Sequence, residues 1–169
     1  MNNRIPVFSI KYGTGKITGE FVKDIVRVAD IAIEDQIFGL TFREDGFAFN
    51  NVPFEGILGL SFPITTSSNS VPFFDNIINT KVLKHNIFSM FLSQENERSS
   101  ILFGNVEKHN MLTNYTFVDV YSKVYWEIDI DEILINNQPT NFCKDLRDQT
   151  GRCGVAIDSG TSLFAAPTE

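Results

Sequence analysis

Clusters of positive charge are absent from this sequence. Its 14 Lys and Arg residues are outnumbered by 21 Asp and Glu, the formal net charge is −7, and no run of Lys or Arg exceeds two residues. Nucleic acids and anionic membrane surfaces are bound through basic patches. We therefore expect neither of them as a partner.

Long apolar stretches are also missing. No run approaches the roughly 20 apolar residues that a helix needs to cross a bilayer. The N-terminal residues Met-Asn-Asn-Arg-Ile-Pro lack the apolar region of a signal peptide. We expect no membrane span in this chain. The protein is then either cytosolic or starts upstream of Met1, and the motifs described below favour the upstream start.

Cysteine and histidine are scarce. Cys143 and Cys153 are separated by nine residues, which excludes a CxxC redox or zinc pair, and His85 and His109 are the two histidines. We expect no metal site and no cofactor. The cysteines either form a local disulfide of a secreted protein or remain two free thiols. The polar residues 144–152 between them are typical of a surface loop that such a disulfide would staple.

The rest of the composition is that of a globular chain. Hydrophobic residues make up 43% and charged residues 21%, which argues against a disordered chain. The 169 residues are enough for one domain with a full core, or for parts of two. The 16 Phe outnumber Tyr and Trp together and indicate bulky apolar walls rather than a polar binding surface.

Alternating apolar and polar residues predict a mostly β structure. Val7–Tyr12 and Lys16–Val22 read as strands, and Gly13-Thr14-Gly15 between them predicts the turn of a hairpin. The further strand-like runs are residues 25–28, 31–33, 36–42, 57–60, 87–92, 101–106, 117–120, 125–135 and 155–158. Their spacing favours an antiparallel sandwich or barrel over alternating βαβ units.

One short helix and one boundary interrupt this pattern. Residues 72–79 begin with Pro and carry paired apolar residues, which predicts a helix after an exposed loop at 65–70. The polar stretch 107–114 predicts a division into residues 1–109 and 110–169. Both ends of the chain read as cut, because the start enters a strand at once and the end enters a Pro-initiated helix.

The segment around Asp158 carries the best candidate for chemistry. The carboxylate follows an apolar strand, and Ser159 and Thr161 supply hydroxyl groups that could hydrogen-bond it and fix its orientation. Burial at the strand end would desolvate it, and Gly160 permits a tight turn. The alternative is an ordinary strand-to-turn junction, where Asp, Ser and Gly are common.

Four segments together resemble one protein family. They are Tyr12-Gly13-Thr14-Gly15, Phe54-Glu55-Gly56-Ile57-Leu58-Gly59-Leu60, Tyr125-Trp126-Glu127-Ile128 and Asp158-Ser159-Gly160-Thr161-Ser162. In this order they are similar to the Tyr-Gly-Thr-Gly flap, the Phe-Asp-Gly-Ile-Leu-Gly-Leu segment, the Tyr-Trp-Gln-Ile segment and the second Asp-Thr-Gly-Thr-Ser motif of the pepsin-like aspartic proteases. The similarity runs from end to end. The Asn- and Ile-rich composition further resembles the plasmepsins of this family.

The resemblance implies an all-β, bilobal fold, present here as an incomplete N-terminal lobe with the flap (1–109) and the start of the C-terminal lobe (110–169). It also implies an aspartic endopeptidase, in which water held between two aspartates attacks the peptide carbonyl. Two carboxylates that close cannot both ionise, so one acts as base and the other as acid. No Asp-Thr-Gly or Asp-Ser-Gly triplet precedes the flap, so only one aspartate of the pair is in this chain.

The residue roles implied by the resemblance follow the motifs. Asp158 is the catalytic aspartate, and Ser159 and Thr161 support the aspartate pair. The substrate-binding residues are Tyr12, Gly13 and Thr14 of the flap, Phe49, Phe54, Ile57 and Tyr125 of the apolar pockets, and Gly160 and Ser162 beside the substrate backbone. For Phe54, Ile57 and Tyr125 the alternative is core packing. Ser159 and Glu55 depart from the usual Thr and Asp, and the loop between the cysteines is longer than in the family.

Several alternatives and expectations accompany this reading. The complete protein would act on peptide or protein substrates as a monomer in the secretory pathway, outside the cell or in an acidic vacuole- or lysosome-like compartment. The sequon Asn114-Tyr115-Thr116 agrees with secretion. A pepsin-like protein that binds without cutting, or an inactive fragment, is the alternative. A β-sandwich adhesion module would not explain the joint motifs, and a Ser-His-Asp hydrolase lacks the Gly-x-Ser-x-Gly elbow.

Overall fold

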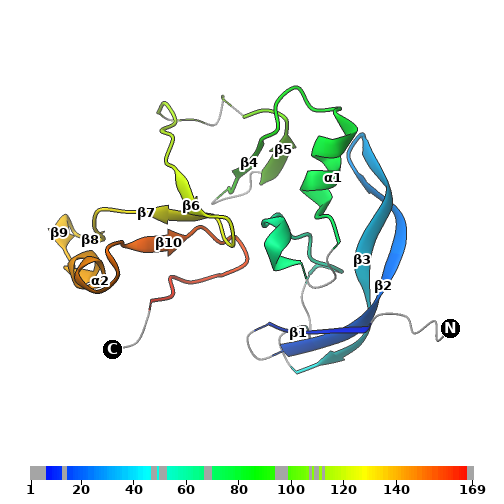
Figure 1. Cartoon of the computed structure of the whole chain (residues 1–169), viewed down its shortest axis with the longest axis horizontal. Helices are drawn as coiled ribbons and strands as arrows, with labels where there is room; N and C mark the ends of the chain where they lie inside the picture. Colours follow the sequence, from blue (N-terminus) through cyan, green and yellow to red (C-terminus); the bar gives the residue numbers. More distant parts are fainter. Residues whose placement is uncertain are drawn as a thin grey trace. The chain divides into compact units, whose positions relative to one another are not determined.

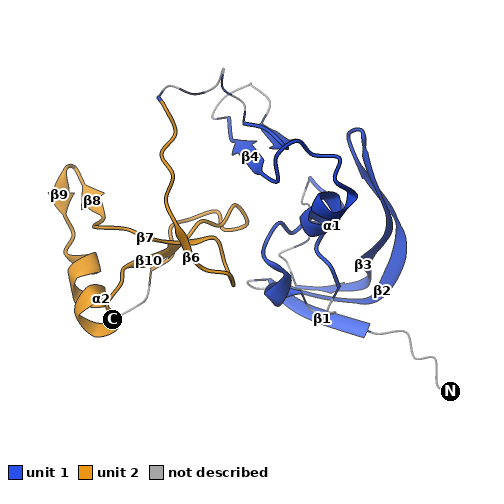
Figure 2. Ribbon diagram, turned by 45° about the horizontal axis from the view of Figure 1, so that its top comes forward, with its two compact units in different colours: residues 1–113 blue, residues 114–169 orange. Residues whose placement is uncertain are grey.

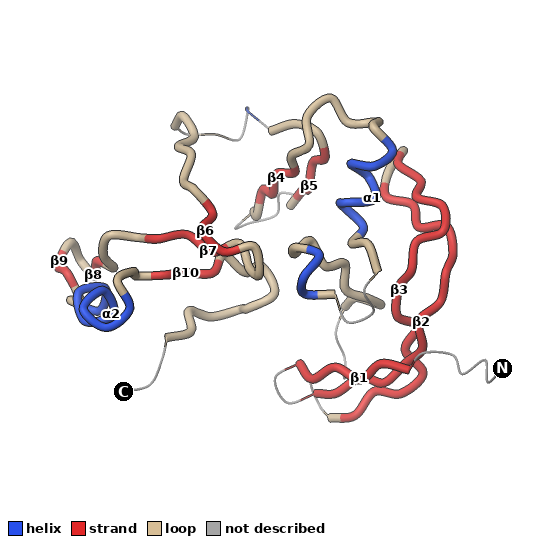
Figure 3. The backbone as a smooth tube through the Cα atoms, viewed as in Figure 1, coloured by secondary structure: helices blue, strands red, loops and turns tan. Residues whose placement is uncertain are grey.

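The computed structural model describes residues 7–12, 15–46, 49, 53–66, 70–93, 99–106, 108, 111 and 113–166. The chain divides into two compact units, residues 1–113 and 114–169 (Figure 2). The described residues are mostly strand and loop, with two α-helices among them (Figure 3). The predicted all-β class is therefore confirmed.

Unit 1 is built around a three-stranded antiparallel sheet in the order β1-β2-β3 (Figure 1). The strands are β1 (Val7–Tyr12), β2 (Gly15–Val28) and β3 (Ile31–Asp45). The predicted first hairpin is confirmed, because Tyr12 pairs with Gly15 and Val7 pairs with Glu20. Its turn residues, 13 and 14, lie outside the described residues.

The division of residues 16–42 into four separate strands was wrong. β2 and β3 form one long hairpin that turns at residues 29 and 30. Its register shifts between Thr18 and Gly19 and again between Asp24 and Val26. A bulge bends a strand without ending it, so the interruptions at residues 23–24 and 34–35 lie at a bulge, and the one at 29–30 is the turn of the hairpin.

Phe8 explains two of the glycines in this sheet. Its ring is buried against Gly19 and Gly39, and a Cβ added at these positions would lie 2.6 Å and 2.5 Å from ring atoms of Phe8. Real Cβ atoms are not found that close to a neighbouring ring, so both positions exclude any side chain. The ring of Phe21, 5.1 Å from that of Phe8, completes this packing.

The core of unit 1 forms where α1 (Phe73–Thr80) lies against β3. The helix confirms the one predicted for residues 72–79. The buried residues of this core are Ile33 of β3 and Phe73 and Ile77 of α1. A short antiparallel pair, β4 (Phe88–Phe91) with β5 (Ser100–Phe103), packs on the same helix through the ring of Phe74. The helix therefore connects the long hairpin to the short pair.

Residues 57–60 were predicted as a strand, and this was wrong. They have no regular secondary structure, and none of the described strands pairs with them. A β-strand needs a neighbour to complete its ladder of hydrogen bonds, so an apolar run alone is not sufficient. A 3₁₀ turn at Pro63–Thr65 follows.

Unit 2 contains a small sheet in the order β10-β7-β6 and a separate two-stranded hairpin (Figure 1). The strands are β6 (Val120–Ser122), β7 (Glu127–Asp129), β8 (Leu134–Ile135), β9 (Gln138–Pro139) and β10 (Gly154–Ala156). The predicted run 125–135 is thus two strands. Asn136 and Asn137 lie between β8 and β9 with φ of 51° and 61°, the conformation that a tight two-residue hairpin turn requires.

The predicted disulfide is confirmed, whereas the predicted loop inside it is wrong. Cys143 and Cys153 are bonded and fully buried, with their Cα atoms 5.0 Å apart. The residues between them form helix α2 (Phe142–Thr150). Gly151, at φ 78°, ends this helix, and its N–H donates to the carbonyl of Arg147 at 2.8 Å. The helix accommodates the additional length of this segment between the two cysteines and brings the chain back to Cys153.

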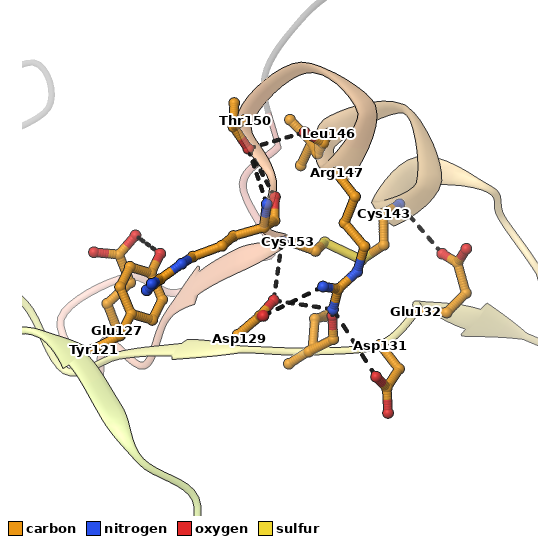
Figure 4. A network of polar contacts seen from close by, with 12 residues as sticks. Tyr121, Glu127, Asp129, Asp131, Glu132, Cys143, Leu146, Arg147, Thr150 and Cys153 are labelled. Atoms are coloured by element: carbon orange, nitrogen blue, oxygen red, sulfur yellow. Dashed lines mark hydrogen bonds and ion pairs between the residues drawn. A yellow bond between two sulfur atoms is a disulfide. The ribbon is translucent and has the colours of Figure 1, made fainter.

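Asp129 joins α2 to the sheet of unit 2 (Figure 4). Its carboxylate accepts the backbone N–H of Cys153 at 2.9 Å and two bonds from the guanidinium of Arg147 at 3.0 and 3.3 Å. These donors favour the ionised form, so the pKa of Asp129 lies below its usual range, chiefly through the Cys153 N–H. The same carboxylate therefore holds the helix and the start of β10.

Candidate active site

Asp158 lies in a turn directly after the short strand β10. The last backbone hydrogen bond before it runs from the N–H of Ile157 to the carbonyl of Trp126, at 2.9 Å. Asp158 itself is exposed. The burial considered for this carboxylate is therefore not found in this chain, because β10 ends at Ala156, two residues before Asp158.

The turn supplies two hydrogen bonds to the Asp158 carboxylate. The hydroxyl of Thr161 donates to Oδ2 at 2.6 Å, and the backbone N–H of Gly160 donates to Oδ1 at 2.8 Å. Both bonds favour the charged form, so the pKa of Asp158 lies below its usual range, with Thr161 as the larger cause. The local sequence thus orients the carboxylate and keeps it ionised.

The other two predicted residues of this turn make no such contact. Ser159 and Ser162 are exposed, and the described hydrogen bonds to Asp158 come from Thr161 and Gly160. Of the two hydroxyl groups predicted to support the aspartate, the structure therefore brings Thr161 to the carboxylate and leaves Ser159 apart from it.

Replacing Thr161 by Ala is expected to raise the pKa of Asp158, because the larger of the causes that lower it is removed. A carboxyl with a lowered pKa stabilises the fold above its unfolded pKa, and this contribution disappears as the pH falls through the folded pKa. Thr161→Ala should therefore narrow the pH range over which the turn is stabilised. NMR titration of the Asp158 carboxyl carbon measures the shift. Thr161→Ser keeps a hydroxyl and should retain the lowered pKa; an unchanged pKa in Thr161→Ala would contradict the assignment.

In unit 1 the structure brings two predicted site residues together. Tyr12 is the last residue of β1, and its ring meets that of Phe49 edge-on, with centroids 5.7 Å apart. Such aromatic pairs contribute roughly 0.5–1.5 kcal/mol beyond their buried area. Gly13 and Thr14, predicted to complete the flap tip, lie outside the described residues. Tyr12 and Phe49 thus form an aromatic pair at the base of that tip.

The remaining predicted pocket residues are open to solvent. Phe54, Ile57 and Tyr125 have exposed fractions of 49%, 60% and 58%. Core packing was the alternative for these residues, and such exposure argues against it within this chain. Phe54 and Ile57 belong to unit 1 and Tyr125 to unit 2.

Comparison with known proteins identifies the family. Residues 2–169 match the family described as "Eukaryotic aspartyl protease". The chain belongs to the eukaryotic aspartyl protease family. It is 39% identical over 161 residues to "Pepsin II-1" of Oryctolagus cuniculus, and the alignment covers 95% of this chain and 40% of that protein. It is 37% identical over 163 residues to "Procardosin-B" of Cynara cardunculus, covering 95% of this chain and 31% of the relative.

This aspartyl protease chain therefore spans two fifths or less of the length of these relatives. The resemblance inferred from the four motifs is confirmed as pepsin-like. The plasmepsin-like assignment stays a prediction.

A cavity of about 500 Å³ lies within unit 1. Ile57 is the one predicted site residue among those that line it. The lining residues are Val26, Gln36, Ile37, Phe38, Ile57, Leu58, Gly59, Ser61, Thr65, Thr66, Ser70, Val71, Pro72 and Phe73. Asp158, the predicted catalytic residue, is not among them.

Gln36 is the buried polar residue among those that line this cavity, and the sequence did not reveal it. It is buried, and its amide nitrogen donates to the carbonyls of Ile37 at 2.9 Å and Val71 at 3.2 Å. Its amide oxygen accepts from Asn76 of α1 at 2.8 Å. These bonds tie α1 and the chain before it to β3, which is a scaffold role. The one signal in the sequence that could have pointed to Gln36 was its position at the start of the strand-like run 36–42.

Two absences hold for the part of the chain that the structure describes. It contains no group of three or more His, Cys, Asp or Glu side chains placed to hold a metal ion. None of its helices combines the length and the apolar character needed to cross a membrane.

Proposed function

We propose that this chain is the part of a pepsin-like aspartic endopeptidase that carries the flap and one catalytic aspartate, Asp158. The observation that carries the proposal is the Asp158 turn. In a chain of this family, an Asp-Ser-Gly-Thr-Ser sequence follows a sheet strand and orients an ionised carboxylate through Thr161 and Gly160.

The proposed reaction is hydrolysis of a peptide bond by water. Asp158 and a second aspartate, contributed from outside these residues, would hold the water and share one proton. One carboxylate then takes a proton from the water, and the other donates one to the carbonyl oxygen of the substrate. The hydrogen bonds at Asp158 favour its charged form, although the titration of such a pair belongs to both groups together.

The substrate side of the proposal rests on the exposed aromatic and apolar residues. Tyr12 with Gly13 and Thr14 would close over a bound peptide, and Phe49, Phe54, Ile57 and Tyr125 would form the walls of the side-chain pockets. Gly160 and Ser162 would contact the peptide backbone. Ser159 would support the aspartate pair once the second aspartate is present. Peptides and proteins are the substrates, and a monomer is the proposed complete form.

The proposed compartment is the secretory pathway, with the mature protein outside the cell or in an acidic vacuole- or lysosome-like compartment. The buried disulfide between Cys143 and Cys153 supports this, because disulfides persist in oxidising compartments. The sequon at Asn114 is exposed, as an acceptor of a glycan must be.

The full-length protein is expected to cleave an unstructured protein substrate at acid pH. A transition-state-mimicking inhibitor of aspartic proteases should block the cleavage, because it occupies the place of the attacked carbonyl between the two carboxylates. Binding of the inhibitor without any cleavage would favour the alternative, a pepsin-like protein that binds peptides and does not cut them. Cleavage that the inhibitor leaves untouched would contradict the proposed mechanism.

Replacing Tyr12 by Ala in the full-length protein is expected to lower kcat/KM by about 10-fold or more with little loss of stability. Tyr12 is partly exposed at the end of β1, so its ring orders the closed flap over the substrate rather than a core. Steady-state kinetics and thermal unfolding separate the two effects. Tyr12→Phe retains the ring and its contact with Phe49, and serves as the matched control. A large fall in Tm with unchanged turnover per folded molecule would show that Tyr12 is structural.

A further inference from the structure

The strand that leads into Asp158 is short, and its alignment rests on few contacts. β10 pairs with β7 through three residue pairs, Gly154 with Asp129, Val155 with Ile128 and Ala156 with Glu127. A slip of one residue would turn every side chain to the opposite face. A slip of two residues would move the chain by about 6.6 Å. The position of Asp158 therefore depends on what holds this register.

Tyr121 reaches across the sheet from a bulge in β6. Val120 pairs with Ile128 and Ser122 pairs with Glu127, so Tyr121 between them is left without a partner on β7. A bulge redirects the side chain of the extra residue. The Tyr121 hydroxyl donates a hydrogen bond to the Glu127 carboxylate, and Figure 4 shows the two side chains together. The guanidinium carbon of Arg152 lies 4.6 Å from the centre of the Tyr121 ring, within cation–π range.

The Tyr121 hydroxyl occupies the space that a side chain at position 154 would need. A Cβ added at Gly154 would lie 2.0 Å from the hydroxyl oxygen of Tyr121 and 2.8 Å from Oε1 of Glu127. Both contacts are shorter than atoms tolerate. Ala156, two positions further along β10 and therefore on the same face of the strand, carries a Cβ. Of these two positions, Gly154 alone can lie beneath the hydroxyl.

We propose that Tyr121, held by Glu127, is a positioning residue. Its hydroxyl lies over Gly154, which fixes the register of β10 against β7 and thereby the location of Asp158. The bond from Ile157 to Trp126 carries this alignment to the residue before the aspartate. Glu127 stands where the pepsin motif has Gln, so the charged acceptor is a departure of this chain from that motif. The inference rests on the proposed function of Asp158.

The test is a double-mutant cycle in the full-length protein, with activity expressed per active site by titration with a tight-binding inhibitor. Gly154→Ala is expected to lower kcat by about 10-fold or more, because a displacement of about 1 Å can lower the rate by about 100-fold. It should also shift the acid limb of the pH profile.

Tyr121→Phe removes the hydroxyl and leaves Cζ as the nearest ring atom, 3.2 Å from the added Cβ. Without the hydroxyl, the flexible Glu127 carboxylate is no longer held beside the added Cβ and can turn away. The double variant should therefore recover to the activity and pH profile of Tyr121→Phe alone. Tyr115→Phe, which removes an exposed hydroxyl in the same unit, is the matched control and should change neither.

Each outcome of the cycle decides the proposal. Effects of Gly154→Ala and Tyr121→Phe that simply add would contradict it, as would an unchanged pH profile in Gly154→Ala. If Gly154→Ala yields no folded protein, recovery of folding in the double variant supports the contact, and failure to recover contradicts it. Asp158→Asn tests the proposed function separately. Lost activity in Asp158→Asn with normal Gly154→Ala would overturn this inference alone.

Discussion

Asp158→Asn in the full-length protein is expected to lower kcat for peptide cleavage by about 10³-fold, within the range that a general acid–base group contributes. An amide cannot accept the proton of the attacking water or share one with a second carboxylate. Thr161 and Gly160 should still hold the replaced side chain, because the Asn oxygen can accept one of their hydrogen bonds. The loss should therefore appear in kcat with little change in stability.

Asp148→Asn is the matched control for this variant. Asp148 is an exposed carboxylate on α2 of the same unit, and its replacement changes the charge by the same amount. Its kcat should equal that of the unmodified protein. Cleavage by Asp158→Asn at the rate of this control would overturn the assignment as an aspartic protease.

The chain of 169 residues, taken alone, is expected not to cleave peptides. One aspartate cannot divide the roles of base and acid. Exposed apolar residues such as Phe117 and Phe164 further favour aggregation of the isolated chain. The same assay, with and without inhibitor, checks this expectation. Inhibitor-sensitive cleavage by the isolated chain would contradict it, unless two copies pair to supply two Asp158 carboxylates.

Removing the disulfide by Cys143→Ala with Cys153→Ala is expected to lower the free energy of unfolding by about 2–3 kcal/mol, the range given by loop-closure entropy for a loop of this length. The bond closes a segment with a sequence separation of 10 and lies fully buried. Ala is preferred to Ser as the replacement because a hydroxyl buried without a partner would add a separate penalty. Denaturant unfolding of the full-length protein measures the loss.

Contacts beside the disulfide should preserve the folded state when the bond is removed, so that the loss of stability comes from the greater freedom of the unfolded chain. Asp129 still binds Arg147 and the N–H of Cys153, and Glu132 accepts the N–H of Cys143 at 3.4 Å. The folded variant should therefore keep α2 in place, with unchanged secondary structure by circular dichroism. Two free thiols in natively folded, secreted protein, or a loss well below 1 kcal/mol, would contradict the stabilising role.

Several predictions from the sequence succeeded because the residues that decide them are neighbours in the chain. The alternation around Gly13-Thr14-Gly15 predicts a hairpin whose partners face each other across one turn. Pro72 and the apolar spacing after it predict α1. The Thr161 bond to Asp158 spans three residues, so the turn sequence nearly determines it. Each of these features depends on residues a few positions apart, so the sequence of that segment determines it.

The failures share one physical cause, which is dependence on a distant partner. Residues 57–60 have the composition of a strand, but a strand exists only where another one supplies hydrogen bonds, and none of the described strands does so. The segment between the cysteines reads as a loop, and it forms α2 with Arg147 held by Asp129, 18 residues earlier in the chain. Composition alone does not reveal these partners.

The sequence alone was sufficient for the family, the Asp158 motif and the candidate residues of the flap and pockets, whereas it left two alternatives open for the cysteines, which the structure resolved as a disulfide. Only the tertiary structure showed that the Asp158 carboxylate is exposed, that Tyr12 meets Phe49, and that Tyr121 lies over Gly154. The motifs consist of residues that are consecutive in the chain, so the sequence displays them directly. Exposure and close approach depend on chain segments that meet only after folding, so the packing of those segments decides them.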